Sequence, residues 1–171
     1  VLEKASIKNF DELYRTNVRV PYELTQATLG ALTRRRGDIV FINSTQGLSA
    51  AGGLSGYAAT QHAMKAVSES LRSEVNGQGV RVTTIHLGRT ATTLQEGIFA
   101  AEGRTYTPEL LIQPDDVADV VANIVALPKR TQITSVTLLP THKGVIRKLH
   151  VVGMWWLEVW WYVGGVWSLG L

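Results

Sequence analysis

Apolar residues recur along this chain with two spacings, which together predict an alternation of helices and strands. Helical spacing runs through three segments, residues 11–36, 57–76 and 113–127. Short apolar, β-branched runs, which are typical of strands buried on both faces, occupy residues 38–43, 80–87 and 132–139. A loop rich in Ser, Gly and Ala is expected over residues 44–56, and a second loop with a short helix over residues 88–107.

Glycine and proline residues mark where these elements bend and end. Pro21 lies inside the first helical segment and predicts a kink or a broken start, and Gly37 is expected to end that helix. Gly77 and Gly79 are expected to end the second helix. Pro114 stands early in the third, ahead of two Asp residues that suit a first turn.

Strands that alternate with helices pair in parallel through right-handed crossovers. The sequence therefore predicts an α/β fold with a parallel, Rossmann-type sheet and flanking helices. In such sheets the chemistry lies beyond the carboxyl ends of the strands. The loops after Asn43 and Leu87 are thus the two candidate positions.

Composition and charge limit the kinds of ligand and partner that we expect this chain to bind. The length of 171 residues and the 45% hydrophobic content fit one domain with a core. The formal charge of +3 has no dominant basic stripe, and the cluster Arg34–Arg36 suits a helix end, so no nucleic acid is expected. Without cysteines there is no disulfide or thiolate site, and the four histidines lack ligand spacing, so no metal is expected. Residues 1–11 do not resemble a signal peptide, and we expect a cytoplasmic protein.

The end of the chain differs in composition from the rest, which separates residues 1–143 from a hydrophobic, Trp-rich tail, residues 144–171. All five tryptophans lie between Trp155 and Trp167, and residues 151–171 carry a single charge, Glu158. A membrane anchor fits this length, although a charge near its middle is costly. A helix that buries its Trp face in an oligomer is the second interpretation. The abrupt change favours the third, a non-native terminus from a shifted reading frame.

Three polar residues stand out near the first loop. Ser44 opens it, Tyr57 begins the next helix thirteen residues later, and Asn17 lies twenty-seven residues before Ser44. Taken singly, Ser44 suits a turn, Asn17 a helix surface and Tyr57 an anchoring aromatic. His62 and His86 suit packing.

Four segments, however, resemble in order and spacing the catalytic landmarks of the short-chain dehydrogenases/reductases, which are NAD- or NADP-dependent oxidoreductases. They are TNVRVPYELTQATL, GDIVFINSTQG, SGYAATQHAMKAVSESLRSEV and VRVTTIHLGRTATTLQ. The resemblance covers about residues 1–140. It implies that residues 1–143 are the C-terminal, catalytic half of such a domain.

The resemblance also implies residue roles. Asn17 would hold a helix kink and a proton-relay water. Ser44 would bind the oxygen of an alcohol or ketone substrate, and Tyr57 would exchange a proton with that oxygen while hydride passes to or from the nicotinamide. Gly88 and Thr92 match the family's nicotinamide loop, in which Thr92 would contact the carboxamide. For Thr92, capping of the short helix after it is the alternative.

Position 61 departs from the family pattern. A phenol has a pKa near 10, so it is a poor base at neutral pH unless a nearby cation acidifies it. The family places a Lys four residues after its Tyr, and this chain has Gln61. As a neutral amide, Gln61 can take that catalytic position and bond to the cofactor ribose, but it supplies no charge. Lys65, one turn further on, is expected at the surface. Leu87 stands where the family usually has Pro.

A second departure concerns the cofactor. The family's Gly-x-x-x-Gly-x-Gly turn, which binds the pyrophosphate through backbone amides, has no match in the sequence. We therefore expect the N-terminal half of the fold to be missing from this chain and its activity to be impaired. Whether the cofactor is NAD or NADP is not set by these residues.

The leading hypothesis is thus an NAD(P)-dependent oxidoreductase, truncated and impaired, that acts on a small alcohol or ketone. The alternative is a non-catalytic interaction module, in which helices 11–36 and 57–76 form a four-helix dimer interface. A homo-oligomer is expected, and a membrane contact through the tail is not favoured. Cofactor binding distinguishes the two hypotheses.

Because the pyrophosphate-binding turn is absent from the sequence, we predict that this 171-residue chain binds NAD(H) and NADP(H) weakly or not at all. Isothermal titration calorimetry checks this prediction. A micromolar or tighter dissociation constant for either cofactor would contradict it.

Overall fold

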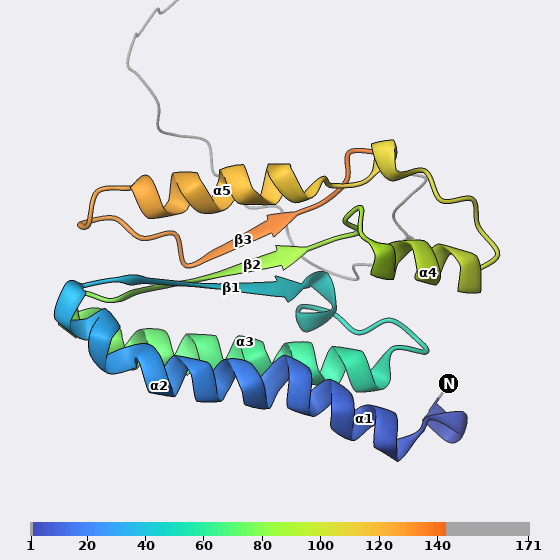
Figure 1. Ribbon diagram of the computed structural model, residues 1–171, viewed down its shortest axis with the longest axis horizontal. Coiled ribbons are helices and arrows are strands. Elements are labelled where there is room, and N and C mark those ends of the chain that lie inside the picture. Colours follow the sequence, from blue (N-terminus) through green and yellow to red (C-terminus); the bar gives the residue numbers. More distant parts are fainter. Residues whose placement is uncertain (1, 143–171) are drawn as a thin grey trace, which may run out of the picture.

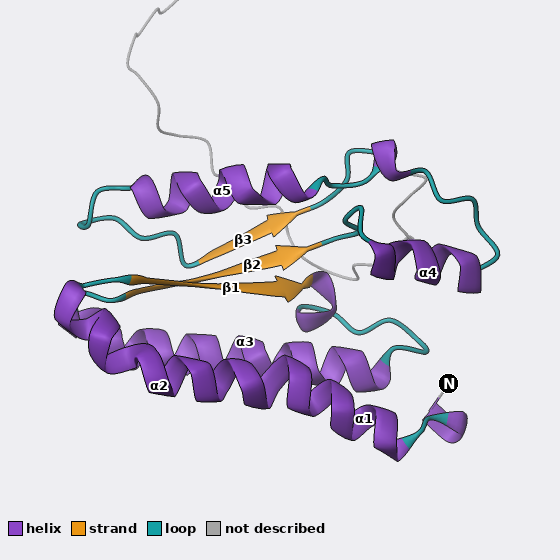
Figure 2. Cartoon of the chain, in the orientation of Figure 1, coloured by secondary structure: helices purple, strands orange, loops and turns teal. Residues whose placement is uncertain are grey.

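The computed structural model describes residues 2–142, in three layers (Figures 1 and 2). The Trp-rich tail assigned to residues 144–171 lies outside the described residues, and that division of the chain stays a prediction. Three helices cover one face of the sheet, namely α1 (Ile7–Tyr14), α2 (Val20–Arg35) and α3 (Ser55–Val75). On the other face lies α5 (Pro114–Ala126), while α4 (Thr93–Ala101) lies beyond the carboxyl ends of the strands.

The sheet has three parallel strands in chain order, β1 (Asp38–Ser44), β2 (Arg81–Leu87) and β3 (Ser135–Leu138). The register pairs Asn43 with His86 and Ser44 with Leu87 at the carboxyl end. The predicted α/β fold with a parallel, Rossmann-type sheet and flanking helices is therefore confirmed. Within the described residues, β1 pairs on one side only and is an edge strand.

A hydrophobic core joins the sheet to the helices below it. Its buried members come from α3 and from the start of β2, namely Leu71, Val75, Val80 and Val82. Leu29 and Leu32 of α2, with Ile39 and Phe41 of β1, pack against them. Removing this apolar surface from water is the main favourable contribution to folding, and it fixes α3 beneath the β1–β2 pair.

Pro21 does not break the first helix. A proline lacks the N–H that would bond to the carbonyl four residues earlier, here that of Asn17, and its ring crowds that carbonyl. The chain responds with a π-helical turn, Arg15–Arg19, in which the N–H of Val20 donates to the carbonyl of Arg15. The expected bend thus takes the form of a wider turn ahead of Pro21, and α2 continues through it.

Element ends differ most from the prediction. The first helix begins at Ile7 rather than at residue 11. Arg36, not Gly37, takes the left-handed conformation that ends α2, with φ of 52°. The reason is that the amide of Gly37 donates to the carbonyl of Leu32 at 2.9 Å, which puts Arg36 at the reversal point. The third strand is shorter than residues 132–139 and covers Ser135–Leu138.

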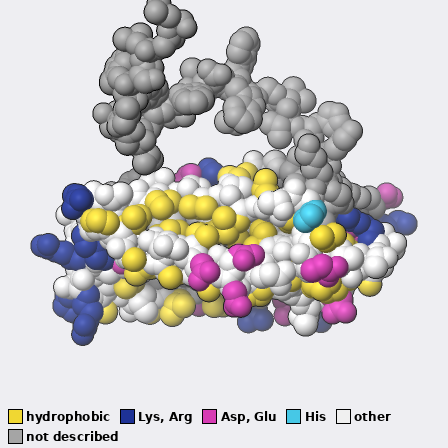
Figure 3. Space-filling model, turned by 90° about the horizontal axis from the view of Figure 1, so that it is seen from above, with side chains coloured by type: hydrophobic (Ala, Val, Ile, Leu, Met, Phe, Trp, Pro, Cys, Tyr) yellow, Lys and Arg dark blue, Asp and Glu magenta, His cyan; other side chains and the backbone are white. Residues whose placement is uncertain are grey.

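Within the described part of the molecule, basic side chains gather at the end where the strands begin (Figure 3). Arg34 and Arg35 lie in the last turn of α2, as expected for cations at a helix end. No described helix combines the length and apolar character that a membrane span needs. Among the described residues no group of three or more His, Cys, Asp or Glu is placed to hold a metal ion. The cytoplasmic location stays a prediction.

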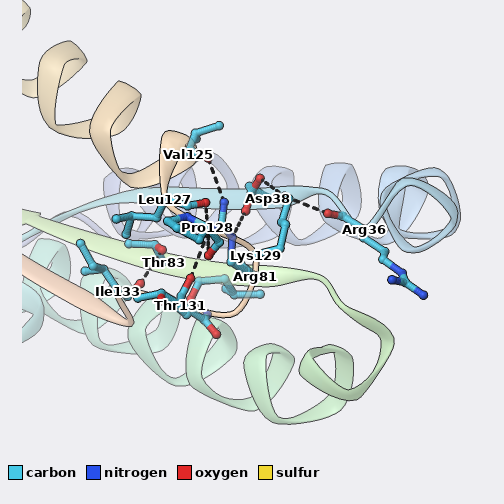
Figure 4. Close-up of polar contacts among 12 residues, drawn as sticks. Arg36, Asp38, Arg81, Thr83, Val125, Leu127, Pro128, Lys129, Thr131 and Ile133 are labelled. Carbon is cyan, nitrogen blue, oxygen red and sulfur yellow. Dashed lines mark hydrogen bonds and ion pairs between the residues drawn. The ribbon is translucent and has the colours of Figure 1, made fainter.

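A buried ion-pair network ties β1 and β2 to the end of α5 (Figure 4). The Arg81 side chain is 7% exposed and pairs through Nε with the Asp38 carboxylate. Its other nitrogens donate to three backbone carbonyls at 2.9–3.0 Å, those of Val125, Leu127 and Thr131. Lys129 Nζ lies 2.7 Å from the second Asp38 oxygen. A buried guanidinium is tolerated because its donors are matched in this way.

The network predicts a pH-dependent stability. Burial by itself would raise the pKa of the Asp38 carboxyl, but hydrogen bonds from Arg81 and Lys129 outweigh it and hold that pKa below its ordinary value. Asp38→Asn leaves Arg81 buried without a counter-ion, so we predict a loss of about 3 kcal/mol in the free energy of unfolding at neutral pH. The ion pair contributes its full stability above the unfolded-state pKa of the Asp38 carboxyl, which is about 3.9. That contribution to stability is lost as the pH falls through the lower folded-state pKa of Asp38.

Urea unfolding at neutral and acidic pH checks this prediction. Asp119→Asn, at an exposed position of α5, is the matched control and should change little. The difference between wild type and Asp38→Asn should shrink once the pH is below the folded-state pKa. A difference that stays constant into strong acid would contradict the account.

Candidate active site

Ser44, the last residue of β1, begins the loop at the carboxyl end of the sheet. Its Oγ accepts the amide of Gln46 at 3.1 Å and so caps the short 3-10 helix that follows. Gly47 packs that helix against the strand. A Cβ on Gly47 would lie 2.7 Å from Asn43 Oδ1 and 2.9 Å from the carbonyl oxygen of Gln61. Only glycine therefore fits where the loop leaves Ser44.

Gln61 is bonded to this strand end. It is 8% exposed, and its Oε1 accepts the Ser44 amide at 3.1 Å. The same amide lies 2.6 Å from Asn43 Oδ1, and Asn43 Nδ2 donates to the Gln61 carbonyl at 3.0 Å. The side chain at the family's lysine position thus joins α3 to β1 by hydrogen bonds.

Asn17 connects the first helix to the start of α3. Its Nδ2 donates to Thr60 Oγ1 at 3.1 Å, and the Thr60 hydroxyl donates to the carbonyl of Tyr57 at 2.7 Å. Asn17 lies in the π-helical turn, where Pro21 cannot bond to its carbonyl. The structure therefore brings Asn17 into indirect contact with the Tyr57 backbone, and its role with a relay water stays a prediction.

Tyr57 lies in the first turn of α3 and is half-buried. It borders an open hollow of about 670 Å³ that α1 residues such as Phe10 and Leu13 also line. Its hydroxyl makes no hydrogen bond within residues 2–142. Tyr57 and Ser44 therefore stand on neighbouring elements, α3 and the end of β1, without a hydrogen bond that joins their side chains.

A second open space, a groove of about 490 Å³, runs between β1 and α2. Its polar end is formed by Asn17, Asn43 and Gln61, and its remaining walls are largely apolar. These three side chains offer amide donors and acceptors without charge. Uncharged amides of this kind are possible hydrogen-bonding partners for hydroxyls and carboxamides.

Gly88 and Thr92 both have structural partners. A Cβ on Gly88 would lie 3.1 Å from the side chains of Leu139 and Pro140, so glycine is needed for close packing beside the end of β3. Thr92 is the N-cap of α4, and its Oγ1 accepts the amide of Gln95 at 3.3 Å. The capping alternative for Thr92 is thus observed, and contact of either residue with a nicotinamide stays a prediction.

The segment between β2 and α5 folds into a compact lobe with its own core. Thr90 forms a parallel bridge with Ile112 at its base. Arg89 holds the Glu102 carboxylate with two hydrogen bonds, at 2.8 and 2.9 Å, and its guanidinium lies 4.8 Å from the centre of the buried Phe99 ring. One wall beside the carboxyl end of β2 is therefore preformed.

Two buried polar residues lie beside Ser44. The packing position predicted for His86 agrees with its burial, but its contact with Ser44 and any role for Asn43 are missed by the sequence reasoning. Asn43 is 5% exposed. The sequence feature that could have identified it is a single amide side chain at the end of an apolar strand. His86 is 2% exposed, with Nδ1 3.3 Å from the Ser44 carbonyl oxygen. Since a carbonyl only accepts, Nδ1 carries the proton in this contact. Burial lowers the pKa of His86, which keeps the ring neutral at physiological pH.

Two other expectations concern the outer face of α3. Lys65 pairs with Glu69 at 2.8 Å, which fits the surface position predicted for it. The packing position predicted for His62 is wrong. His62 is exposed, and its Nδ1 lies 2.9 Å from the Ala58 carbonyl oxygen of the same helix.

Comparison with known proteins finds one recurring group. A family model described as short chain dehydrogenase matches residues 1–103. The uncharacterized short-chain type dehydrogenase/reductase y4eK of Sinorhizobium fredii is 31% identical over 141 residues. The NADP-dependent 3-hydroxy acid dehydrogenase YdfG of Salmonella typhi is 31% identical over 143 residues. A solved structure of the closed form of serine dehydrogenase complexed with NADP+ matches with a TM-score of 0.71 at 26% identity.

These matches cover most of this chain but only part of each relative. Both curated relatives align with 80% of the chain, which spans 57% of the first and 58% of the second. The solved structure aligns with 81% of the chain, over 58% of its own length. The chain thus spans less than two thirds of the length of the proteins it matches.

Proposed function

Because this chain belongs to the short-chain dehydrogenase/reductase family, we propose that it carries the catalytic half of an NAD(P)-dependent oxidoreductase acting on a small alcohol or ketone. The observation that carries this proposal is the junction of β1 and α3. There Ser44 ends a parallel strand, Tyr57 lies in the first turn of the next helix, and Asn17 bonds to Thr60 of that helix. Two similar proteins named for 3-hydroxy acids and for serine support a substrate that bears a hydroxyl group.

In the proposed reaction Ser44 and Tyr57 both act on the same substrate oxygen. Reduction of a ketone builds negative charge on its oxygen, so the site needs an aimed donor and a proton source. Ser44 donates a hydrogen bond to that oxygen, and Tyr57 delivers the proton to it. Asn17 positions Tyr57 through the Thr60 hydroxyl. In the oxidation of an alcohol the same groups act in reverse.

A nicotinamide cofactor, when bound, supplies or accepts the hydride. The polar end of the groove beside β1 fits the ribose and carboxamide of such a group, because its amide side chains, Asn17 and Gln61 among them, are neutral hydrogen-bonding partners. Gly88 follows the last residue of β2, and Thr92 caps α4 beyond the carboxyl ends of the strands. No glycine-rich turn for the phosphates occurs in the sequence, so we propose weak cofactor binding and impaired activity for this chain.

The missing charge at position 61 gives a mutational test. Gln61→Lys places an ammonium one turn from Tyr57, and a cation within about 4–6 Å favours a phenolate. In a chain fused to a complete cofactor-binding half, we predict that Gln61→Lys raises the rate of NAD(P)H-dependent ketone reduction at neutral pH by at least about tenfold, which is about 1.4 kcal/mol of barrier. The lost acceptor for the Ser44 amide is a smaller effect, because Asn43 Oδ1 still accepts that amide.

Tyr57→Phe in the same fused background is the control. It keeps the ring and removes the hydroxyl, so it should abolish the gain from Gln61→Lys. A Lys variant that is no faster, or a Phe variant that keeps the improved rate, would exclude Tyr57 as the acid/base residue.

The second candidate function, a non-catalytic interaction module, is favoured by the edge of β1, which pairs on one side only among residues 2–142. Ile42 on this strand is 54% exposed, and Leu24 of α2, across the groove, is 62% exposed. Unpaired strand edges bind other chains through their free N–H and C=O groups. In this reading helices 11–36 and 57–76 form the proposed four-helix dimer interface, and the β1 edge is a further surface through which the chain self-associates into a dimer or larger species.

Light scattering of the 171-residue chain across a tenfold dilution tests the association. We predict a dimer or larger species, and Ile42→Lys should shift it toward the monomer because a charged side chain blocks edge pairing. Leu94→Lys, at a 72% exposed position of α4, is the matched control and should leave the mass unchanged. A monomeric wild-type mass at every concentration would refute the association.

A further inference from the structure

We propose that Asn43 and His86 are positioning residues for Ser44. Together with Gln61 they hold the backbone amide and carbonyl of Ser44, so that its Oγ has one fixed direction at the carboxyl end of the sheet. We call Asn43, Gln61 and His86 the Ser44 support. The proposal depends on the proposed function only in the claim that Ser44 faces the substrate.

The backbone amide of Ser44 has two hydrogen-bond acceptors. Its N–H lies 2.6 Å from Asn43 Oδ1 and 3.1 Å from Gln61 Oε1. One acceptor would satisfy this donor, and the structure supplies two from different elements, β1 and α3. Asn43 also donates to the Gln61 carbonyl at 3.0 Å, which locks the two acceptors to each other.

The carbonyl side of Ser44 is held from β2. The register places His86 beside Asn43, and His86 Nδ1 donates to the Ser44 carbonyl at 3.3 Å. The groups of α3 that act on His86 electrostatically are Lys65 and Glu69, which pair with each other. The neutral His86 ring is therefore a fixed donor to the last carbonyl of β1.

Packing alone does not explain these side chains. All three members of the Ser44 support are buried, while the neighbouring buried positions of β2 include Val82 and Ile85. Buried amides and imidazoles are costly unless every polar group is matched. Here Asn43 Nδ2 and Oδ1, Gln61 Oε1 and His86 Nδ1 are matched by the backbone of Ser44 or by another member of the support.

The result is an oriented donor. Ser44 is extended, with φ of −117° and ψ of 156°, and only χ1 remains to place its Oγ. That oxygen accepts the Gln46 amide at 3.1 Å, and no acceptor takes its O–H within residues 2–142. The hydroxyl is thus free to donate to a substrate oxygen from a fixed point, as precise sites require of their supporting residues.

NMR of the 171-residue chain tests the support without any turnover. We expect Asn43→Leu and His86→Leu to accelerate hydrogen exchange of the Ser44 amide at least about tenfold and to shift its amide resonances, while the core amide of Val82 stays protected. His86→Asn keeps a donor near the position of Nδ1 and should restore most of the wild-type signature. Gln61→Met, which removes one of the two acceptors, should give a smaller effect in the same direction.

The matched control is Thr84→Val. The Thr84 hydroxyl donates to Ser68 Oγ at 2.9 Å, so the variant removes another buried polar contact between β2 and α3 without touching Ser44. It should leave the Ser44 signature unchanged. If Thr84→Val changes the Ser44 amide as much as His86→Leu does, or if the Leu variants leave it unchanged, then the positioning role is refuted.

Kinetics in the fused, cofactor-complete chain separate this proposal from the proposed function. A positioning role predicts that His86→Leu lowers kcat at least about tenfold with little change in KM, and that His86→Asn recovers it. A fused chain that reduces no ketone refutes the proposed function, and the NMR result still decides the support. Equal loss in the Leu and Asn variants would contradict the positioning role.

Discussion

The hydrogen bonds between the end of β1 and the middle of α3 fix the geometry on which the rest of the candidate site depends. A parallel strand ends with backbone groups that need partners as the chain leaves the sheet. Here Asn43 and Gln61 share the Ser44 amide, and Gly47 lets the loop pack directly on them. The same contacts attach α3 to β1 at Gln61, one helical turn after Tyr57.

The opposite end of the strands is held by a different chemistry. Arg81 and Asp38 pair under the last turn of α5, and the Arg81 guanidinium also satisfies backbone carbonyls that would otherwise be unpaired. Charged side chains hold the end of the sheet where the strands begin, and neutral side chains hold the end of β1 at Ser44.

The sequence predicts the layered fold well because apolar periodicity is a local property that follows the element type. It predicts element ends less well, since the end of α2 depends on a bond between Gly37 and Leu32 that selects Arg36 for the reversal. The site shows the same division. Sequence reasoning finds Ser44, Tyr57 and Asn17 by motif, and it finds the missing charge at Gln61.

Sequence reasoning does not find what Gln61 does instead, because its bond to the Ser44 amide spans seventeen residues and two elements. The contact of His86 with Ser44 is missed for a similar reason. This contact exists only in the register of β1 against β2. The π-helical turn at Asn17 follows from Pro21 once the helix is known to continue, which the sequence leaves open.

The central claim is that Ser44 and Tyr57 serve one substrate oxygen at the carboxyl end of β1. A crystal structure of the chain completed with a cofactor-binding half, with NADP+ and a ketone-like inhibitor bound, tests it most directly. The account predicts that Ser44 Oγ and the Tyr57 hydroxyl both lie within about 2.6–3.2 Å of the same inhibitor oxygen. An inhibitor oxygen bound by neither group, with Tyr57 still facing the hollow beside α1, would contradict it.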